Sequence, residues 1–188
     1  MKVIGVTGGV GAGKSEVLRL MEKYFRARVI QADEVGRRLM EPGGATYERI
    51  LQTFGREFAL ENGQIDREKL SREIFGSEKK RKILNGIVHP LVHQAIEEEI
   101  ETLRQDSESS FSCAVVESAI LAEGGLADLC DVIWYIHAPE EVRIRRVMET
   151  RGYSREKAES VIARQMKEGE YRKICGTVVE NGTSLEET

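Results

Sequence analysis

The sequence predicts an α/β fold in which a parallel sheet of five strands is covered by helices on both faces. Short runs of apolar or β-branched residues without polar alternation are typical of strands that are buried on both sides. Amphipathic stretches at helical spacing separate these runs, as expected when helices connect parallel strands. A glycine-rich segment joins the first expected strand to the first expected helix.

Each expected strand is short and is followed by Gly, Asp, Glu, Pro or Asn, residues that commonly end strands. The expected strands are Val3–Val6, Arg28–Ile30, Cys113–Val116, Val132–Ile136 and Thr177–Val179. The first two are separated by one helix. About eighty residues of helical pattern separate the second strand from the third, which is too long for a simple crossover. We therefore expect an inserted helical subdomain there.

The expected helices alternate with these strands or fill the insertion. They are Lys14–Phe25, Asp33–Met40, Tyr47–Phe54, Asp66–Phe75, Pro90–Arg104, Glu140–Glu149 and Arg155–Lys167. Proline suits the first position of a helix, so we expect one helix to begin at Pro90 and expect non-helical geometry at His89. Ser154 is a good N-cap for the last helix.

Composition and charge narrow the classes of function. The chain of 188 residues has room for one core with insertions or for two small domains. Its 28 Lys and Arg against 32 Asp and Glu leave a net charge of −4, which disfavours a nucleic-acid partner. Its three scattered Cys fit a reducing compartment, and no apolar run is long enough to cross a membrane. We expect a cytoplasmic protein without a signal peptide or membrane partner.

The glycine-rich segment matches the pattern G-x-x-x-x-G-K-[ST] between a strand and a helix. It comprises Gly8, Gly9, Val10, Gly11, Ala12, Gly13, Lys14 and Ser15. Glycines let the loop direct several backbone N–H groups at one phosphate, and the following helix adds its positive end. Lys14 would reach the β- and γ-phosphates, and Ser15 would bind Mg²⁺. The alternative is a glycine-rich turn that binds nothing.

Other features separate a kinase from other nucleotide-binding proteins. The chain has no Asn-Lys-x-Asp segment to read guanine and is short for a helicase or transporter ATPase. A helical insertion and an arginine-rich helix pair are typical of a small-molecule kinase with a closing lid, which excludes water. We expect a nucleotide-binding core (1–33, 111–139 and 172–188), an acceptor-binding subdomain (34–110) and a lid (140–171).

Asp33 follows the second expected strand, and ligands of open parallel sheets bind beyond the carboxyl ends of the strands. A carboxylate there can orient an acceptor hydroxyl and take its proton. The alternative is that Asp33 only caps the following helix. Glu117 likewise ends the third expected strand and is a candidate ligand of Mg²⁺ or its waters; the alternative is a strand-end carboxylate in solvent.

The chain resembles the dephospho-coenzyme A kinase family nearly from end to end. The matching segments are Val6–Ser15, Ala32-Asp33, Phe54-Gly55, Ile65–Arg67, Leu84–Pro90, Ile120–Glu123 and Asn181-Gly182. The resemblance implies a phosphotransferase with an alcohol group as acceptor: ATP phosphorylates the ribose 3′-hydroxyl of dephospho-coenzyme A, the last step of coenzyme A synthesis. Alternatives are another small-metabolite or nucleoside-monophosphate kinase, or a non-catalytic nucleotide-dependent switch. We expect a monomer or a weak homo-oligomer.

The resemblance also implies roles for particular residues. It identifies Asp33 as the carboxylate that activates the acceptor, with Lys14 and Arg146 as further catalytic residues. Residues implied to bind the nucleotide are Gly8, Gly9, Gly11, Ala12, Gly13, Lys14, Ser15, Glu16 and Asn181. Residues implied to bind the acceptor are Thr7, Asp33, Arg67 and His89, and candidate metal ligands are Ser15 and Glu117.

The chain departs from the family pattern at three positions. It has Gln31 where the family has Asp, Ala119 where the family has Pro, and Glu16 where the family has Thr. The first and third change the charge or polarity beside the metal site. They bear on rate and metal affinity more than on the class of reaction.

Basic residues fall into two groups with different interpretations. Arg143, Arg145, Arg146 and Arg151 crowd one helix and its end. Arg143 and Arg146 share a helix face and could neutralise a transferring phosphoryl group, unless the arginines form a solvated face with neighbouring glutamates. In the insertion, Arg67 could bind an acceptor phosphate, whereas the run 79–82 is more typical of a solvated basic patch.

Overall fold

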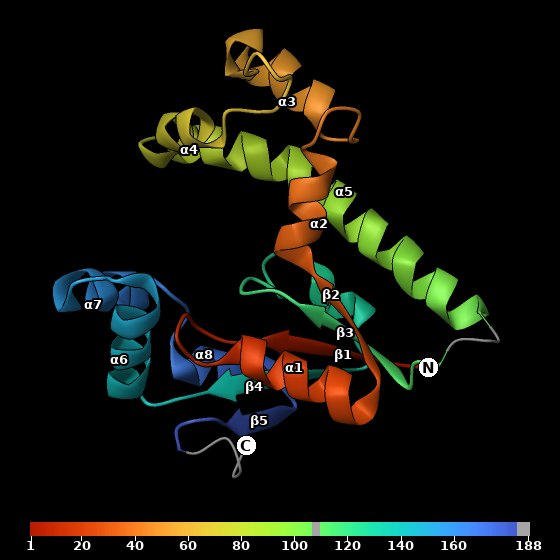
Figure 1. Cartoon of the computed structure of the whole chain (residues 1–188), viewed down its shortest axis with the longest axis vertical. Coiled ribbons are helices and arrows are strands. Elements are labelled where there is room, and N and C mark those ends of the chain that lie inside the picture. Colours follow the sequence, from red (N-terminus) through yellow and green to blue (C-terminus); the bar gives the residue numbers. More distant parts are fainter. Residues whose placement is uncertain (107–109, 184–188) are drawn as a thin grey trace. The chain divides into compact units, whose positions relative to one another are not determined.

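The structure is a computed structural model that describes residues 1–106 and 110–183 (Figure 1). It comprises two compact units, of which the first contains Met1–Ile30 and Leu103–Thr188 and the second contains Gln31–Thr102. Residues 107–109 of the expected subdomain and residues 184–188 of the expected core lie outside the described residues. In the part of the chain that the structure describes, no helix is both long and apolar enough to cross a bilayer.

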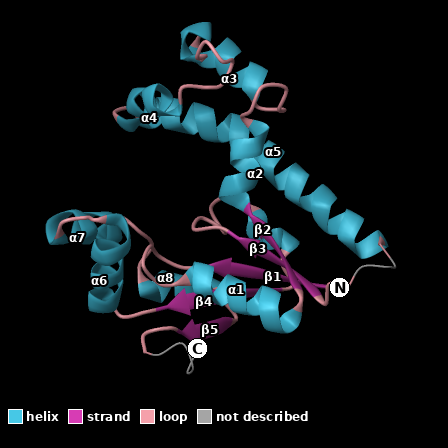
Figure 2. Ribbon diagram, viewed as in Figure 1, coloured by secondary structure: helices cyan, strands magenta, loops and turns pink. Residues whose placement is uncertain are grey.

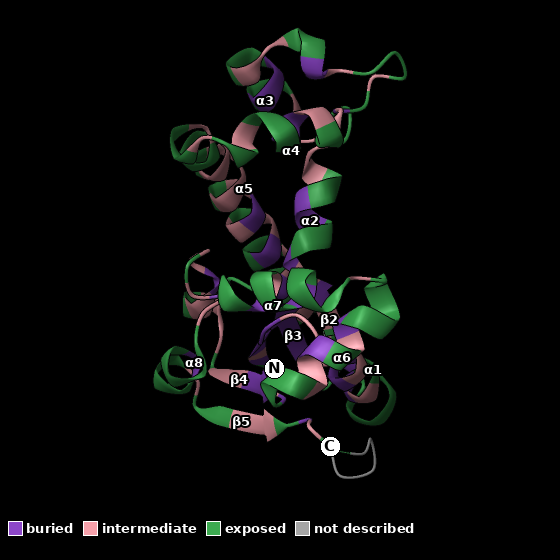
Figure 3. Cartoon of the chain, turned by 90° about the vertical axis from the view of Figure 1, so that its left-hand side faces the viewer, coloured by how far each residue is buried: buried purple, intermediate pink, exposed green. Residues whose placement is uncertain are grey.

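A sheet of five strands carries the first unit, with the order β2-β3-β1-β4-β5. The strands are β1 (Lys2–Thr7), β2 (Ala27–Gln31), β3 (Cys113–Glu117), β4 (Val132–His137) and β5 (Thr177–Glu180). Strand β1 runs parallel to β3 and β4, and β4 runs parallel to β5. All residues of β3 are buried, as Figure 3 shows. The predicted α/β fold with a five-stranded parallel sheet is confirmed.

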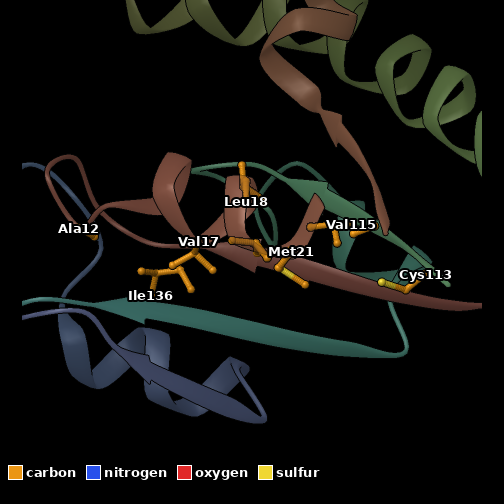
Figure 4. Close-up of a cluster of buried hydrophobic side chains, with 9 residues drawn as sticks. Ala12, Val17, Leu18, Met21, Cys113, Val115 and Ile136 are labelled. Atoms are coloured by element: carbon orange, nitrogen blue, oxygen red, sulfur yellow. The ribbon is translucent and has the colours of Figure 1, made fainter. Parts of the chain in front are cut away.

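Helices cover both faces of this sheet. On one face, α1 (Lys14–Phe25) packs Val17 and Leu18 into a cluster with Ile136 of β4 (Figure 4). On the other face, the ring of Tyr171 in α8 (Glu168–Ile174) stacks on Tyr135, with centroids 4.5 Å apart and an interplanar angle of 8°. Consecutive strand residues point to opposite faces of the sheet, so Tyr135 and Ile136 pack against helices on opposite sides of it.

The segment between β4 and β5 contains three helices. Helices α6 (Glu140–Arg151) and α7 (Arg155–Ala163) bury Ile144, Val147, Ala158 and Ile162 against each other. Ser154 caps α7 as predicted, because its hydroxyl accepts a hydrogen bond from the backbone N–H of Lys157. The prediction that this helix runs to Lys167 is wrong. Lys167 is the N-cap of α8, and its backbone N–H donates to the carboxylate of Glu170, which starts the new helix.

The second unit is formed by helices and loops (Figure 2). Its elements are α2 (Ala32–Leu39), α3 (Tyr47–Phe54), the 3₁₀ turn η1 (Arg56–Phe58), α4 (Arg67–Phe75) and the greater part of α5 (Glu78–Gln105). Its own apolar core contains Ile50, Leu51, Phe58, Ile65 and Leu70. Asp66 caps α4, since its side chain accepts the backbone N–H of Lys69 at 2.9 Å.

Helix α5 passes without a break through Pro90, so the expected start of a helix at Pro90 and the expected non-helical geometry at His89 are both wrong. Proline inside a helix costs about 3 kcal/mol, because its N–H is missing and its ring crowds the carbonyl four residues earlier. The continuous helix buries Val92, Ile96 and Ile100, and this burial offsets the cost of the proline.

Candidate functional site

The phosphate loop connects the end of β1 to the start of α1 with backbone geometry that only glycine adopts readily. Gly11 has φ of 76° and Gly13 has φ of 89°. A side chain at Gly11 would lie 2.6 Å from the carbonyl oxygen of Arg143, and one at Gly13 would overlap the side-chain amide of Asn181. Both positions therefore require glycine for conformation and for space.

Helix α1 begins immediately after this loop, so the backbone N–H groups of Lys14 and Ser15 have no carbonyl partner within the helix, whereas those of Glu16 and Val17 donate to the carbonyl of Gly13. The N–H groups of Lys14 and Ser15 and the helix dipole make the site attractive to an anion. Glu16 introduces a negative charge in the first turn, where the helix dipole favours it. Hydrogen bonds from Arg19, at 3.0 and 3.1 Å, lower the pKa of the Glu16 carboxyl. The unusual charge at Glu16 is thus partnered one turn along the helix.

The ammonium of Lys14 lies between two oxygen atoms beside the loop. It donates a hydrogen bond to the carbonyl of Gly8 at 2.9 Å, and it lies 3.6 Å from Oε1 of Glu117. Glu117 ends β3 in register with Val6 of β1, which brings its carboxylate to the loop. The side chain of Glu117 is only 12% exposed. The alternative that Glu117 is a strand-end carboxylate in solvent is wrong.

Asn181 and Arg146 brace the other side of the loop. The side-chain amide of Asn181 donates to the carbonyl of Ala12 at 2.8 Å, and its backbone N–H donates to the carbonyl of His137 at 2.7 Å. One guanidinium nitrogen of Arg146 donates to the carbonyl of Asn181 at 2.8 Å and lies 3.4 Å from that of Ala12. The segment after β5 and helix α6 are both joined to the loop through Ala12.

A cavity of about 660 Å³ opens beside the loop, within the size range of sites for small organic ligands. Its walls are formed by Gly9, Val10, Gly11, Gly13, Lys14, Ser15, Glu16, Arg146, Val147, Thr150, Arg151, Asn181 and Thr183. It therefore includes most residues predicted to bind the nucleotide. Gly8 and Ala12 contribute carbonyls that hold Lys14 and Asn181, whereas the predicted acceptor residue Thr7 is 1% exposed at the end of β1.

The residues around this cavity fit a magnesium ion by the chemistry of their donors. Ser15 lines the cavity as the second residue of α1, and Glu117 lies beside Lys14. Hydroxyl and carboxylate oxygens, together with phosphate oxygens of a nucleotide, are the ligands that Mg²⁺ prefers. Both candidate metal ligands thus come from elements that border the phosphate loop.

The arginine-rich helix α6 turns one face to the phosphate loop. Nε of Arg143 donates to the carbonyl of Val10 at 3.0 Å, and Arg146 contacts Ala12 as described. The alternative of a solvated charged face is therefore wrong for these two arginines. Arg145 and Arg151 are exposed, and Arg151 lines the cavity.

Sequence reasoning missed Gln165, which lies two residues after the end of α7. Its Oε1 atom accepts hydrogen bonds from the backbone N–H of Val10 at 3.0 Å and from Arg143 at 2.5 Å. Gln165 and Val10 are 155 residues apart in the sequence. No local pattern around a single glutamine indicates such a contact, so only the folded chain discloses it.

Three further predicted site residues, Asp33, Arg67 and His89, belong to the second unit. Asp33 is exposed in the first turn of α2, whose N-cap is Gln31 without a side-chain hydrogen bond, so the alternative that Asp33 is the N-cap is wrong. Arg67 is exposed at the start of α4 and donates to the carbonyl of Arg37 at 3.0 Å. His89 is half-buried within α5. The roles of these residues stay predictions.

Comparisons with known proteins bear on the activity of this site. The family model described as dephospho-CoA kinase matches residues 2–187. The dephospho-CoA kinase of Carboxydothermus hydrogenoformans is 36% identical over 188 residues, covering 100% of this chain and 89% of the relative. That of Oceanobacillus iheyensis is 38% identical over 188 residues, covering 99% and 92%. The solved dephospho-CoA kinase from Campylobacter jejuni has the same fold, with a TM-score of 0.71 at 24% identity and coverage of 100% and 92%.

Proposed function

This chain belongs to the dephospho-CoA kinase family, and from that premise we propose how its residues divide the work of one reaction. It is an enzyme that phosphorylates dephospho-coenzyme A with ATP in coenzyme A biosynthesis. The acceptor atom is the 3′-hydroxyl of the ribose, and the reaction takes place in the cytoplasm with Mg²⁺. The protein acts as a monomer or a weak homo-oligomer and uses no nucleic-acid or membrane partner.

The observation that carries this proposal is the position of Lys14 beside the glycine loop. Its ammonium has one firm hydrogen bond, to the carbonyl of Gly8, and a longer ion pair with Glu117. A nucleoside triphosphate that enters the adjoining cavity of about 660 Å³ can draw this ammonium toward the oxygens of its β- and γ-phosphates. The backbone N–H groups of Lys14 and Ser15 at the start of α1 hold the β-phosphate from the other side.

The charge of the transferring group needs further neutralisation, because negative charge spreads over its oxygens in the transition state. Mg²⁺ would supply positive charge to the phosphates, and Ser15 and Glu117 are the residues that would hold it. Arg146 is held at the cavity wall by carbonyls of Asn181 and Ala12. We assign to Arg146 the role of a preorganised cation for the phosphoryl oxygens.

The acceptor side uses residues outside the nucleotide cavity. Asp33 has an exposed carboxylate, available to accept the proton of the acceptor hydroxyl. Arg67 and His89 bind the acceptor within the subdomain 34–110, and Thr7 contributes from the end of β1. The lid, residues 140–171, excludes water so that the γ-phosphoryl group reaches the acceptor and not the solvent.

The experiment that tests this function measures release of ADP in a coupled assay with purified protein, ATP and Mg²⁺. Dephospho-coenzyme A, adenosine monophosphate, uridine monophosphate and shikimate are compared as acceptors. We expect release that depends on dephospho-coenzyme A and exceeds that with every other acceptor. Release only with the nucleoside monophosphates or shikimate would contradict the proposed substrate, and no acceptor-dependent release at all would point to a non-catalytic nucleotide-binding protein.

A further inference from the structure

Val10, at the tip of the phosphate loop, has both of its backbone polar groups bound by side chains from a distant part of the chain. Its N–H donates to Oε1 of Gln165 at 3.0 Å, and its carbonyl accepts from Nε of Arg143 at 3.0 Å. A bond from Nη2 of Arg143 to Oε1 of Gln165, at 2.5 Å, closes the ring. We call these three connected hydrogen bonds between Val10, Arg143 and Gln165 the loop clip.

The chemistry of the loop clip requires an acceptor at position 165. Both neighbours of the Gln165 side chain are N–H donors, so its oxygen and not its amide nitrogen faces them, and the two lone pairs of that oxygen serve one donor each. Without it, the N–H of Val10 and one N–H of Arg143 lose their shared partner. Gln165 and Arg143 are both only partly exposed, which limits replacement of the acceptor by water.

Packing around the loop clip leaves little freedom at the tip. The side chain of Val10 packs on the cluster that includes Ile144 of α6 and Ile162 of α7. A side chain at Gly9 would overlap Nη2 of Arg143 and would lie 2.7 Å from Oε1 of Gln165. The tip of the loop is therefore attached to helices α6 and α7 and to Gln165 through the side chain of Val10 and through its backbone N–H and carbonyl groups.

We propose that Gln165 is a positioning residue for ATP. It holds the tip of the phosphate loop, and through Arg143 the start of α6, in the conformation that receives the phosphates. Its effect reaches the nucleotide through Val10 and Arg143 and needs no direct contact with it. This inference extends the proposed function, because it assumes that the loop binds ATP. Because the loop clip holds the backbone of Val10 and lies outside the proposed reacting groups, its loss weakens ATP binding and leaves the chemical step nearly unchanged.

Two substitutions at position 165 separate this role from simple packing. Gln165→Met keeps the length of the side chain and removes the acceptor, whereas Gln165→Glu keeps an acceptor oxygen for both donors. We expect Gln165→Met to raise the Kd and KM for ATP by roughly tenfold, as for the loss of a partly buried hydrogen bond. The KM for dephospho-coenzyme A and kcat should change by less than about threefold. Gln165→Glu should bind ATP within about threefold of wild type.

Calorimetric titration with ATP and steady-state kinetics are carried out on the full chain at a temperature where thermal melting shows every variant to be folded. Gln52→Met, at an exposed position of α3, is the matched control and should leave all constants unchanged. If wild type binds ATP but a folded Gln165→Met variant binds it equally well, or if Gln165→Glu is as impaired as Gln165→Met, the inference is wrong. Absence of ATP binding by wild type itself would instead contradict the proposed function.

A second variant keeps the inference testable if Gln165→Met does not fold. Gly9→Ala adds one methyl group that must displace the guanidinium of Arg143 from Gln165. The backbone of Gly9 does not have the positive φ that would itself strain alanine. We expect a loss of ATP affinity like that of Gln165→Met. Unchanged ATP affinity in folded Gly9→Ala would overturn the inference.

Discussion

The Nζ atom of Lys14 lies 3.6 Å from Oε1 of Glu117, and the two side chains are only 16% and 12% exposed. At this distance the pair is an ion pair without a firm hydrogen bond, so each charge can be redirected toward a ligand. A nucleotide phosphate would attract Lys14, and a metal ion would attract Glu117. Substitution of either residue removes this ion pair, in which both side chains are largely withdrawn from solvent, so we expect both positions to be sensitive to substitution.

Replacement of Lys14 by Ala removes the ammonium that contacts the phosphates in the ground state and the transition state. We expect kcat/KM to fall by at least about a hundredfold, the effect of losing one preorganised donor. Lys23→Ala, at an exposed position of the same helix, is the control and should retain wild-type kinetics. Wild-type kinetics for a folded Lys14→Ala variant would contradict the assignment of the phosphate loop.

Replacement of Glu117 by Gln keeps the shape of the side chain and removes the charge proposed to hold Mg²⁺. We expect the concentration of Mg²⁺ that gives half-maximal activity to rise by about tenfold or more, as for changes around metal ligands. The measurement is a titration of activity with Mg²⁺ at saturating ATP. Glu22→Gln, exposed on α1, serves as the control. An unchanged Mg²⁺ requirement would exclude Glu117 from the metal site.

Replacement of Asp33 by Asn tests the proposed activation of the acceptor. Because Asp33 is exposed and is not the N-cap of α2, we expect little change in stability. The kcat should fall by about two to four orders of magnitude, the range for a general base, while the affinity for ATP stays the same. The adjacent Glu34 is also exposed in the first turn of α2, so Glu34→Gln is the matched control and should remain active. Normal turnover by Asp33→Asn would remove this carboxylate from the mechanism.

Stability should depend on pH through a charge network at the ends of β4 and β5. Arg172 hydrogen-bonds Glu168 and lowers the pKa of its carboxyl, and His137, together with Arg172, lowers the pKa of the Glu180 carboxyl. A carboxyl whose pKa is lower in the folded state stabilises the fold above its ordinary value of 4.5 and loses this effect as pH falls below it.

Arg172→Met should therefore have a lower Tm than wild type at pH 7, and this difference should shrink as the pH falls below that ordinary value. The exposure of the groups keeps the expected effect small. Arg164→Met, at an exposed position after α7, should follow the wild-type profile of Tm against pH. A difference in Tm that is constant from acid to neutral pH would exclude the network as its cause.

The phosphate loop could be predicted from sequence because all of its chemistry is local. The glycines, Lys14 and Ser15 are adjacent, and the strand and helix that flank them have strong patterns of their own. The position of Glu117 at the end of a buried strand was also predictable, since parallel strands bring their carboxyl ends to one edge of the sheet. The loop residues are close in the fold because they are adjacent in the sequence, and Glu117 is close to them because it ends a neighbouring parallel strand.

Other features depend on tertiary contacts that the sequence does not disclose. The continuation of α5 through Pro90 reflects the burial of residues after the proline and the packing of partly buried residues before it, which override a local preference. The break after α7 reflects the helix start at Lys167 and the use of Gln165 by a loop from the other end of the chain. Such long-range partners for single polar residues have no periodicity from which they could be predicted.

We propose that the γ-phosphoryl group of ATP passes to the ribose 3′-hydroxyl of dephospho-coenzyme A. The most direct test follows an isotopic label from the γ-phosphate of ATP into the products, with mass spectrometry and ³¹P nuclear magnetic resonance to locate it. We expect the label in coenzyme A as a 3′-phosphate, in amounts equal to the ADP formed. Label found only in inorganic phosphate, or on a hydroxyl other than the 3′-hydroxyl, would contradict the account.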